Sequence, residues 1–422
     1  MPVAARSAPT PPAAHDPGYV EDVVAAVFVA PYLLPTTVRF LAAALDLENV
    51  ALGLISTDPL DRLPREVAAG LAAHRQIADC LDPDQLTEAM SSMGPVDRIL
   101  GPLEELQVPM AQVRERLGVS GLGVEAAANF RDKERMKSVL DAAGVPCARH
   151  RLVGSAADLW SFSAEVGYPL VLKPPAGSGS RSTYRLESDE QLAEWMRWNR
   201  LSESEPILCE EFMVGREHSF DCVFLGGEPV FWSVSRYYPT PLDVLQNPWI
   251  QWAVILPRTL DGYGEIERVG PAAISALGLE TGLVHMEWFQ RPDGSAAVSE
   301  AAVRPPGAQF TTLISHAHEF DLYAAWGRLM ILGTFEPPAR RYAVGAVYLR
   351  GQGAGEIIAI EGLDAAQAEV EGMVVDVRLP PLGTPPSPHY EGDGYVIVRG
   401  DETEAVEEAV DAILANVRVL LG

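Results

Sequence analysis

The chain has 422 residues and a formal net charge of −26 at pH 7, with 58 acidic and 32 basic residues. The length suggests roughly two to four domains, and a hydrophobic fraction of 48% suffices for large cores. A field this negative repels nucleic acid and anionic membranes, so we expect neither as a partner; a local cluster of cations can still bind ATP.

The cysteines and the hydropathy of the chain favour a cytoplasmic protein. Cys80, Cys147, Cys209 and Cys222 are scattered without a Cys-x-x-Cys pair, which is typical of reduced thiols. No segment approaches the roughly 20 apolar residues that span a bilayer. Residues 1–18, rich in proline and alanine and without the apolar region of a signal peptide, predict a disordered tail.

Residues 19–125 alternate strands and helices and predict an N-terminal α/β domain with a small parallel sheet. The expected strands are 23–30, 50–55 and 97–100, and the expected helices are 36–45 and 84–93. The turn after the first strand has no Gly-x-Gly-x-x-Gly motif, so a dinucleotide fingerprint is absent.

Residues 126–215 predict a small lobe. Asn129 is expected to cap a helix over 130–143. Further helices are expected at 156–165 and 188–200, and strands at 170–173, 182–186 and 206–212.

Residues 216–340 predict a large lobe, and residues 341–422 a small C-terminal α+β subdomain. In the large lobe we expect strands at 218–225 and 229–237, a Pro- and aromatic-rich lid or specificity loop at 238–252, a helix at 271–279 and a hairpin of 283–290 with 296–304. The subdomain is expected to hold strands at 342–348, 356–360 and 394–399 and a terminal helix at 402–421.

Only three of the 32 basic residues are lysines, namely Lys133, Lys137 and Lys173. Lysine is a compact three-donor charge that suits phosphate oxygens, whereas arginine is a planar fork. Lys173 ends an apolar strand before a Gly/Ser loop, and Lys133 lies in the first turns of a helix, where ligands often bind. The pattern predicts a phosphate site; the alternative is that mutational bias left three lysines at random.

The hairpin predicts a Mg²⁺ site. In the register expected for its turn, His285 faces Glu300 and Glu287 faces Val298, so Glu287 and Glu300 are diagonal neighbours, roughly 7–8 Å apart at the backbone. Their carboxylates could converge on one or two Mg²⁺ ions, or on Mn²⁺ as a substitute. The alternative is a structural ion pair with Arg304 on the same face.

A third motif predicts the hinge of a nucleotide cleft. The apolar strand that ends in Glu210 and Glu211 is followed by a bend at Gly215 and a further acid, Glu217. Backbone groups and one carboxylate there can take the adenine amino group, and the later acid can take ribose hydroxyls. Paired acids at a strand end are also common without a ligand.

Together these motifs resemble the ATP-grasp superfamily, specifically its carboxylate–amine ligases. They are Asp132-Lys133-x-x-Met136, Tyr168-Pro169-Leu170-Val171-Leu172-Lys173-Pro174 with its Gly/Ser loop, Glu210-Glu211-Phe212-x-x-Gly215-x-Glu217, and His285-x-Glu287 followed by Glu300-x-x-x-Arg304. The resemblance covers about residues 19–420. It implies an α/β protein in which a small parallel-sheet domain precedes a two-lobed α+β ATP-grasp fold with a small C-terminal α+β subdomain.

The resemblance implies a role for each matching residue. Lys133 and Lys173 would contact ATP phosphates, under a flap formed by Ser178, Gly179 and Ser180. Glu210 would accept from the adenine amino group, with Glu211 and the Phe212 backbone beside it, and Glu217 would hold the ribose. Glu287 and Glu300 would hold Mg²⁺, and Arg304 and Lys173 would be catalytic, Arg304 by steadying the substrate carboxylate or the acyl phosphate.

One position departs from the family. The usual third metal ligand, an asparagine two residues after the second glutamate, is replaced by Ala302. An alanine cannot ligate, so the number of bound metal ions stays open.

The activity implied is an ADP-forming ligation of a small carboxylate, such as an amino acid, to an amine. The alternatives are a catalytically degenerate ATP-binding protein, a carboxylase-like member that uses bicarbonate, or a scaffold. A homodimer is expected only by analogy. Several side chains stay open between substrate contact and ordinary packing: His285, His316, His318, Trp232, Tyr237, Tyr238, Trp249 and Trp252.

Overall fold

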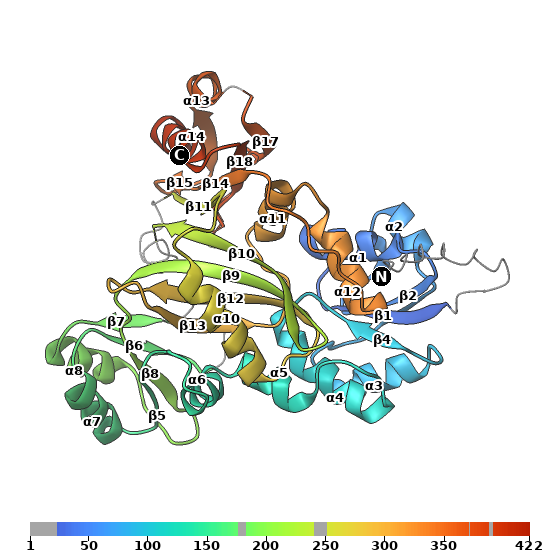
Figure 1. Ribbon diagram of the computed structural model, residues 1–422, viewed down its shortest axis with the longest axis horizontal. Coiled ribbons are helices and arrows are strands. Elements are labelled where there is room, and N and C mark those ends of the chain that lie inside the picture. The colour runs from blue at the N-terminus through green and yellow to red at the C-terminus, as the bar shows by residue number, and fades with distance from the viewer. Residues whose placement is uncertain (1–22, 176–182, 240–250, 371, 388–390) are drawn as a thin grey trace, which may run out of the picture.

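The computed structural model describes residues 23–175, 183–239, 251–370, 372–387 and 391–422 (Figure 1). The described chain begins with a parallel sheet in the order β3-β2-β1-β4. Its elements are β1 (Val24–Ala30), α1 (Pro35–Leu45), β2 (Val50–Ser56), η1 (Leu60–Arg62), α2 (Arg65–Gly70), β3 (Ala73–Gln76), α3 (Pro83–Ser91), β4 (Arg98–Leu100), η2 (Glu104–Leu106) and α4 (Gln107–Leu117). Alternate residues of β1 are buried on both faces, against α1 on one side and α3 and α4 on the other, as in other parallel sheets. The predicted N-terminal strands and helices are confirmed.

Two helices lead into the small lobe, whose antiparallel sheet has the order β5-β8-β6-β7. The elements are α5 (Val124–Arg131), α6 (Lys133–Ala142), β5 (His150–Val153), α7 (Ala156–Val166), β6 (Leu170–Lys173), β7 (Tyr184–Leu186), α8 (Asp189–Trp198) and β8 (Ile207–Glu211). Leu159 and Phe162 of α7 and Leu192 of α8 pack on Leu170 and Leu172 of β6. The opposite face of this sheet is therefore left for other contacts.

An eight-stranded sheet forms the large lobe, in the order β13-β12-β9-β10-β11-β14-β18-β17. Its strands are β9 (Arg216–Leu225), β10 (Glu228–Tyr238), β11 (Trp252–Leu256), β12 (Gly282–Gln290), β13 (Ala296–Ala302), β14 (Ala343–Leu349), β17 (Val374–Arg378) and β18 (Gly394–Gly400). The remaining elements are α10 (Gly264–Leu277), α11 (Phe310–His318), α12 (Leu322–Leu332), α13 (Leu363–Glu369), α14 (Thr403–Asn416) and the small sheet of β15 (Gly351–Gln352), β16 (Ile357–Glu361) and β19 (Arg418–Leu421).

Three cores cover the two faces of this sheet, and one of them lies between α13, α14 and the strands β11, β14 and β18. One face packs against α10 and α6, and the other packs against α11 and α12, which also contact the N-terminal sheet. The ring of Trp326 in α12 lies 5.0 Å from that of Phe40 in α1, so the N-terminal domain is joined to the large lobe through α12. The large sheet also continues through β14, β18 and β17, so the residues on both sides of the expected boundary at 340 share one sheet. The five domain boundaries stay predictions.

The structure differs from the sequence expectations at three helices. Asp132, not Asn129, caps α6 by accepting from the N–H groups of Glu134 and Arg135, and residues 124–131 form a separate helix. Helix α10 begins at Gly264 and contains Pro271 inside it. The expected terminal helix ends at Asn416, and the strand β19 follows.

Some expectations cannot be compared with the structure. The tail 1–18, the flap residues Ser178, Gly179 and Ser180, and Trp249 in the expected lid lie outside the described residues. Within the described part of the chain, every helix is too short or too polar to cross a membrane.

Candidate active site

Two acidic side chains face each other on the large sheet. Glu287 in β12 pairs directly with Glu300 in β13, so the two side chains leave the same face of the sheet. The predicted register was wrong at two points: Gln290 pairs with Ala296 and not with Ser295, and Ser299 forms a β-bulge that shifts the pairing by one more residue. The shift replaces the expected diagonal contact by a direct one and therefore brings the two carboxylates closer than expected.

The three lysines meet these acids and Glu210. The ammonium group of Lys133 lies 2.7 Å from Glu300, and that of Lys173 lies 3.0 Å from Glu210. Lys137 Nζ lies 3.4 Å from Glu210 and donates to the carbonyl of Ser299 in the bulge at 2.9 Å. Helix α6, the strands β6 and β8 and the hairpin therefore carry one cluster of charges. In Figure 1 these elements lie where the small lobe meets the large sheet.

Burial and mutual attraction set the charge states in this cluster. Lys137 is fully buried, and burial lowers its pKa. Burial opposes the charged form of Lys173 as well, but Glu210 and Glu300 outweigh it and raise the pKa of Lys173. Burial would also raise the pKa of Glu210, yet Lys137 and Lys173 hold it below its ordinary value. The cluster is thus a set of charged groups that stabilise one another.

Glu287 is the acid without a cation beside it. Within the described residues its carboxylate has no hydrogen bond or ion pair, and burial together with the charge of Glu300 raises its pKa. Lys133 and Lys173 overcome burial and lower the pKa of Glu300. A divalent cation between the two carboxylates would relieve their repulsion, and oxygen ligands are those that Mg²⁺ prefers.

The donor set therefore fits a Mg²⁺ ion that keeps waters or phosphate oxygens as further ligands. No group of three or more acidic, histidine or cysteine side chains that could hold a metal occurs in the described part of the chain. Ala302 lies opposite His285, so its methyl group adds no ligand. The protein supplies two carboxylates at this point.

His285 is held by a different acid from the one expected. Its Nδ1 lies 2.7 Å from Asp221 Oδ1, and Asp221 Oδ2 accepts from the hydroxyl of Ser219 at 2.9 Å. The predicted pairing with Glu300 is wrong, because His285 pairs with Ala302, two residues further along the hairpin: the turn and the bulge each shift the register by one.

The hinge acids divide between two environments. Glu211 accepts from the N–H and the guanidinium of Arg149, at 2.9 and 2.6 Å, so its side chain is engaged at the edge of the small lobe. The N–H of Phe212 donates to the carbonyl of Pro169, which leaves the Phe212 carbonyl as its group for an adenine contact. Glu217 pairs with Phe289 in the large sheet. Their nucleotide roles remain predictions.

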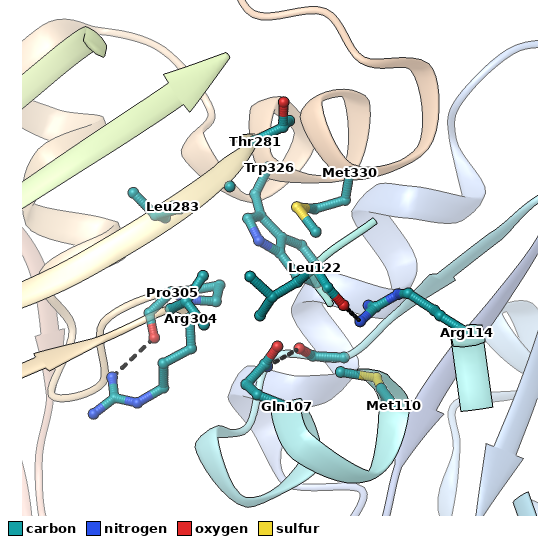
Figure 2. Close-up of a pocket in the computed structure, with 13 residues that line it drawn as sticks. Gln107, Met110, Arg114, Leu122, Thr281, Leu283, Arg304, Pro305, Trp326 and Met330 are labelled. Carbon is teal, nitrogen blue, oxygen red and sulfur yellow. Dashed lines mark hydrogen bonds between the residues drawn. The ribbon is translucent and has the colours of Figure 1, made fainter. Parts of the chain in front are cut away.

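Arg304 follows β13 and contacts the N-terminal domain. Its Nε donates to Glu104 at 3.4 Å and its Nη1 donates to the carbonyl of Pro305 at 3.0 Å. Figure 2 shows this side chain at the edge of a small cavity between α4, β12 and α12.

The other histidines and aromatic residues that were candidates for substrate contact lie mainly in cores. His318 is buried beside Phe231, and burial lowers its pKa to about 3. Trp252 stacks on Tyr348 with ring centroids 4.3 Å apart. These contacts favour the packing interpretation of both side chains. Further side chains are placed as follows: His316 half-buried in α11, Trp232 stacked on Phe220, Tyr237 against Trp252 and Phe310, and Tyr238 exposed.

Sequence reasoning assigned no role to Lys137, Asp221 or Glu104. Lys137 had a usable signal, because it is one of three lysines and lies one helical turn after Lys133. Asp221 and Glu104 had none, because each is one acid among 58 and its partner is distant in the sequence.

The small-lobe sheet and the large sheet thus bring three lysines together with Glu210 and Glu300, next to Glu287. No family model matches the chain. It is 26% identical over 268 residues to the L-arginine-specific L-amino acid ligase of Bacillus subtilis, over 60% of this chain and 63% of that protein. It is 30% identical over 238 residues to the alanine–anticapsin ligase of Bacillus subtilis, over 52% of this chain and 50% of that protein.

The chain thus matches between half and two thirds of the length of these curated relatives. A solved L-amino acid ligase from Bacillus licheniformis has a TM-score of 0.75 at 18% identity, covering 96% of this chain and 100% of that one. The chain therefore has the fold of the ATP-grasp ligases and is similar in sequence to carboxylate–amine ligases.

Proposed function

We propose that this chain is an ATP-dependent, ADP-forming ligase that joins a small carboxylic acid, an amino acid or a related acid, to an amine. The observation that carries the proposal is the convergence of the three lysines on Glu210 and Glu300, next to Glu287. The names of the two ligases from Bacillus subtilis support the reaction class.

The chemistry requires activation of the acid. A carboxylate does not react with an amine, because its leaving group is poor. Transfer of the γ-phosphoryl group of ATP to the carboxylate gives ADP and an acyl phosphate, and the amine then displaces inorganic phosphate as the amide forms. Phosphoryl transfer of this kind depends mainly on positioning and on neutralising charge.

The residues of this chain divide that work. Lys133 and Lys173 would bind phosphate oxygens, and Lys137, fixed to the bulge carbonyl, would hold Glu210 in place. Arg304 would hold the carboxylate of the acid. Mg²⁺, held by Glu287 and Glu300, would supply further neutralisation of the phosphates.

We also infer the setting of this activity. The partners are a small carboxylate and an amine, without nucleic acid or membrane, in the cytoplasm. The four cysteines, all free and at most partly exposed, fit that compartment. A homodimer is proposed by analogy alone, and light scattering would test it.

The direct test is ADP release from Mg-ATP, screened against pools of amino acids and other small carboxylates with amine acceptors. We expect release that depends on one acid and one amine and is lost in Lys173→Ala. Arg268→Ala is the matched control, because it removes a cation from the exposed side of α10. Absence of both ATP binding and ADP release would reject the proposal.

Ala302 favours a second candidate, a catalytically degenerate ATP-binding protein. The chain lacks a metal ligand at this position, and no described side chain replaces it. Clear ATP binding without ADP release from any pool would support this candidate.

A further inference from the structure

The buried carboxylate of Glu104 connects the N-terminal domain to Arg304. Glu104 lies in η2, just after β4, and is 7% exposed. One of its oxygens accepts from Arg131 Nη1 at 3.0 Å, and the other accepts from Arg304 Nε at 3.4 Å. These three residues come from η2, from α5 and from the segment after β13. One carboxylate therefore joins three parts of the chain that are distant in sequence.

The contacts of Arg304 leave one nitrogen of its guanidinium for a ligand. Nε is used by Glu104 and Nη1 by the Pro305 carbonyl. For Nη2, no hydrogen-bond partner occurs among the described residues, and the side chain remains 22% exposed. Because the guanidinium is planar and two of its nitrogens are fixed, the N–H groups of Nη2 point in a set direction.

The cavity beside Arg304 is not the site of that ligand. Its internal volume is about 20 Å³, room for about one water molecule. Leu122 and Trp326 are among the residues that line it, and Figure 2 shows the Arg304 guanidinium directed away from both. A ligand of Arg304 must therefore bind outside this cavity.

We propose that Glu104 is a positioning residue that orients Arg304 toward the carboxylate of the substrate acid. The proposal rests on the proposed ligase function. Glu104 also holds Arg131, which is followed by the Asp132 cap and Lys133 at the start of α6. The same carboxylate thus links Arg304, proposed to bind the substrate acid, to the helix that carries Lys133, one of the two lysines proposed to bind phosphate.

The test is steady-state kinetics of Glu104→Gln with the acid and amine found by the ADP-release screen. We expect the KM for the acid to rise about tenfold or more, since small displacements of a binding group are costly, and the KM for ATP to change less than about twofold. Glu105→Gln is the matched control, because Glu105 is the next residue and makes no ion pair in the described part of the chain. An unchanged KM for the acid, or an equal rise in Glu105→Gln, would overturn the proposal.

Arg304→Lys tests the same contact from the other side, because lysine lacks the Nε–H that meets Glu104. We expect the variant that combines Glu104→Gln with Arg304→Lys to have the same KM for the acid as Arg304→Lys alone, since both substitutions remove the same contact. Additive increases in KM would contradict a shared role. Arg304→Lys also tests the contact if Glu104→Gln does not fold.

Crystal structures separate this proposal from the ligase proposal. If the natural protein turns over no acid, the ligase function fails, and structures of the natural protein and Glu104→Gln still decide the positioning role. A guanidinium of Arg304 that moves in the variant supports the role, and one that stays in place overturns it.

Discussion

Replacing Glu210 by glutamine tests whether one buried carboxylate holds the charge cluster together. Glu210 is 3% exposed and lies 3.0 Å from the ammonium group of Lys173 and 3.4 Å from that of Lys137. Removing one partner of a buried ion pair costs about 3–5 kcal/mol, because the remaining charge is left buried without compensation. Here two ammonium groups lose their common partner, so we expect the free energy required to open the small lobe to fall by an amount in this range.

Lys137→Met provides the contrast. It leaves the pair of Glu210 with Lys173 intact and removes the repulsion between two ammonium groups. Its losses are the 3.4 Å ion pair with Glu210, which keeps Lys173 as its partner, and the hydrogen bond to the carbonyl of Ser299, worth about 1 kcal/mol. Glu210→Gln should therefore destabilise the small lobe several times more than Lys137→Met does.

The assay is alkylation of Cys209 by iodoacetamide, followed by mass spectrometry of its peptide. Cys209 precedes Glu210 in β8, is fully buried, and burial raises the pKa of its thiol to about 12, so it reacts only when the sheet opens. Glu210→Gln should accelerate the labelling by about 10²–10⁴-fold, at 1.4 kcal/mol per factor of ten. Cys80, in the core of the N-terminal domain, is the internal control and should not change.

Acceleration of less than about tenfold at Cys209 would refute the reasoning. An equal acceleration at Cys80 would also refute it, because the cost would then be global. Mg-ATP should slow the labelling more in Glu210→Gln than in the natural protein, since phosphates can replace the missing negative charge beside the lysines.

Three further changes test the metal site and the hinge. Because the folded pKa of Glu287 lies above its unfolded value, the ligand-free fold loses stability as the pH rises through the folded pKa. Glu287→Gln should therefore raise the melting temperature by about 1–3 °C at pH 7 and should give no gain at pH 4. Mg-ATP should stabilise this variant less than it stabilises the natural protein. Ala302→Asn should lower the Mg²⁺ concentration for half-maximal ATP binding by about tenfold in calorimetric titrations, and an unchanged value would show that this position faces no metal. Gly215→Ala should cost about 1–3 kcal/mol in thermal denaturation, because a Cβ there would lie 2.5 Å from the Gln290 carbonyl oxygen, and unchanged stability would contradict that close approach.

The sequence predicted the order of the elements better than their ends. Aliphatic runs such as those of β1 and β2 identify buried strands without knowledge of their neighbours. The start of α10 differs from the prediction, because proline is typical of the first turn of a helix, whereas seven residues of helix precede Pro271. Asp132 was missed as a cap because Asn129 is an equally suitable capping residue by type alone.

For the site, the sequence indicated the residues but not their pairing. The scarcity of lysine identified Lys133 and Lys173, and the structure places both in the charge cluster. The register of the hairpin could not be predicted, because the sequence shows neither the one-residue shift at the turn nor the bulge at Ser299, whose carbonyl accepts from Lys137 of another helix. Interactions between distant segments, such as Glu104 with Arg304, leave no local pattern in the sequence.

The ion pairs of the cluster are best understood as exchangeable. Lys133 holds Glu300 at 2.7 Å, although both residues are proposed to bind parts of Mg-ATP. A cation at the two carboxylates would weaken the hold of Glu300 on Lys133, and a phosphate would replace that carboxylate as the partner of the ammonium group. The desolvation of these charges is then already part of the ligand-free fold, so binding exchanges one set of counter-charges for another instead of burying new charges. The ligand-free ion pairs thus keep the site assembled. Breaking them on binding costs only the difference in interaction free energy between the carboxylate partner and the phosphate partner.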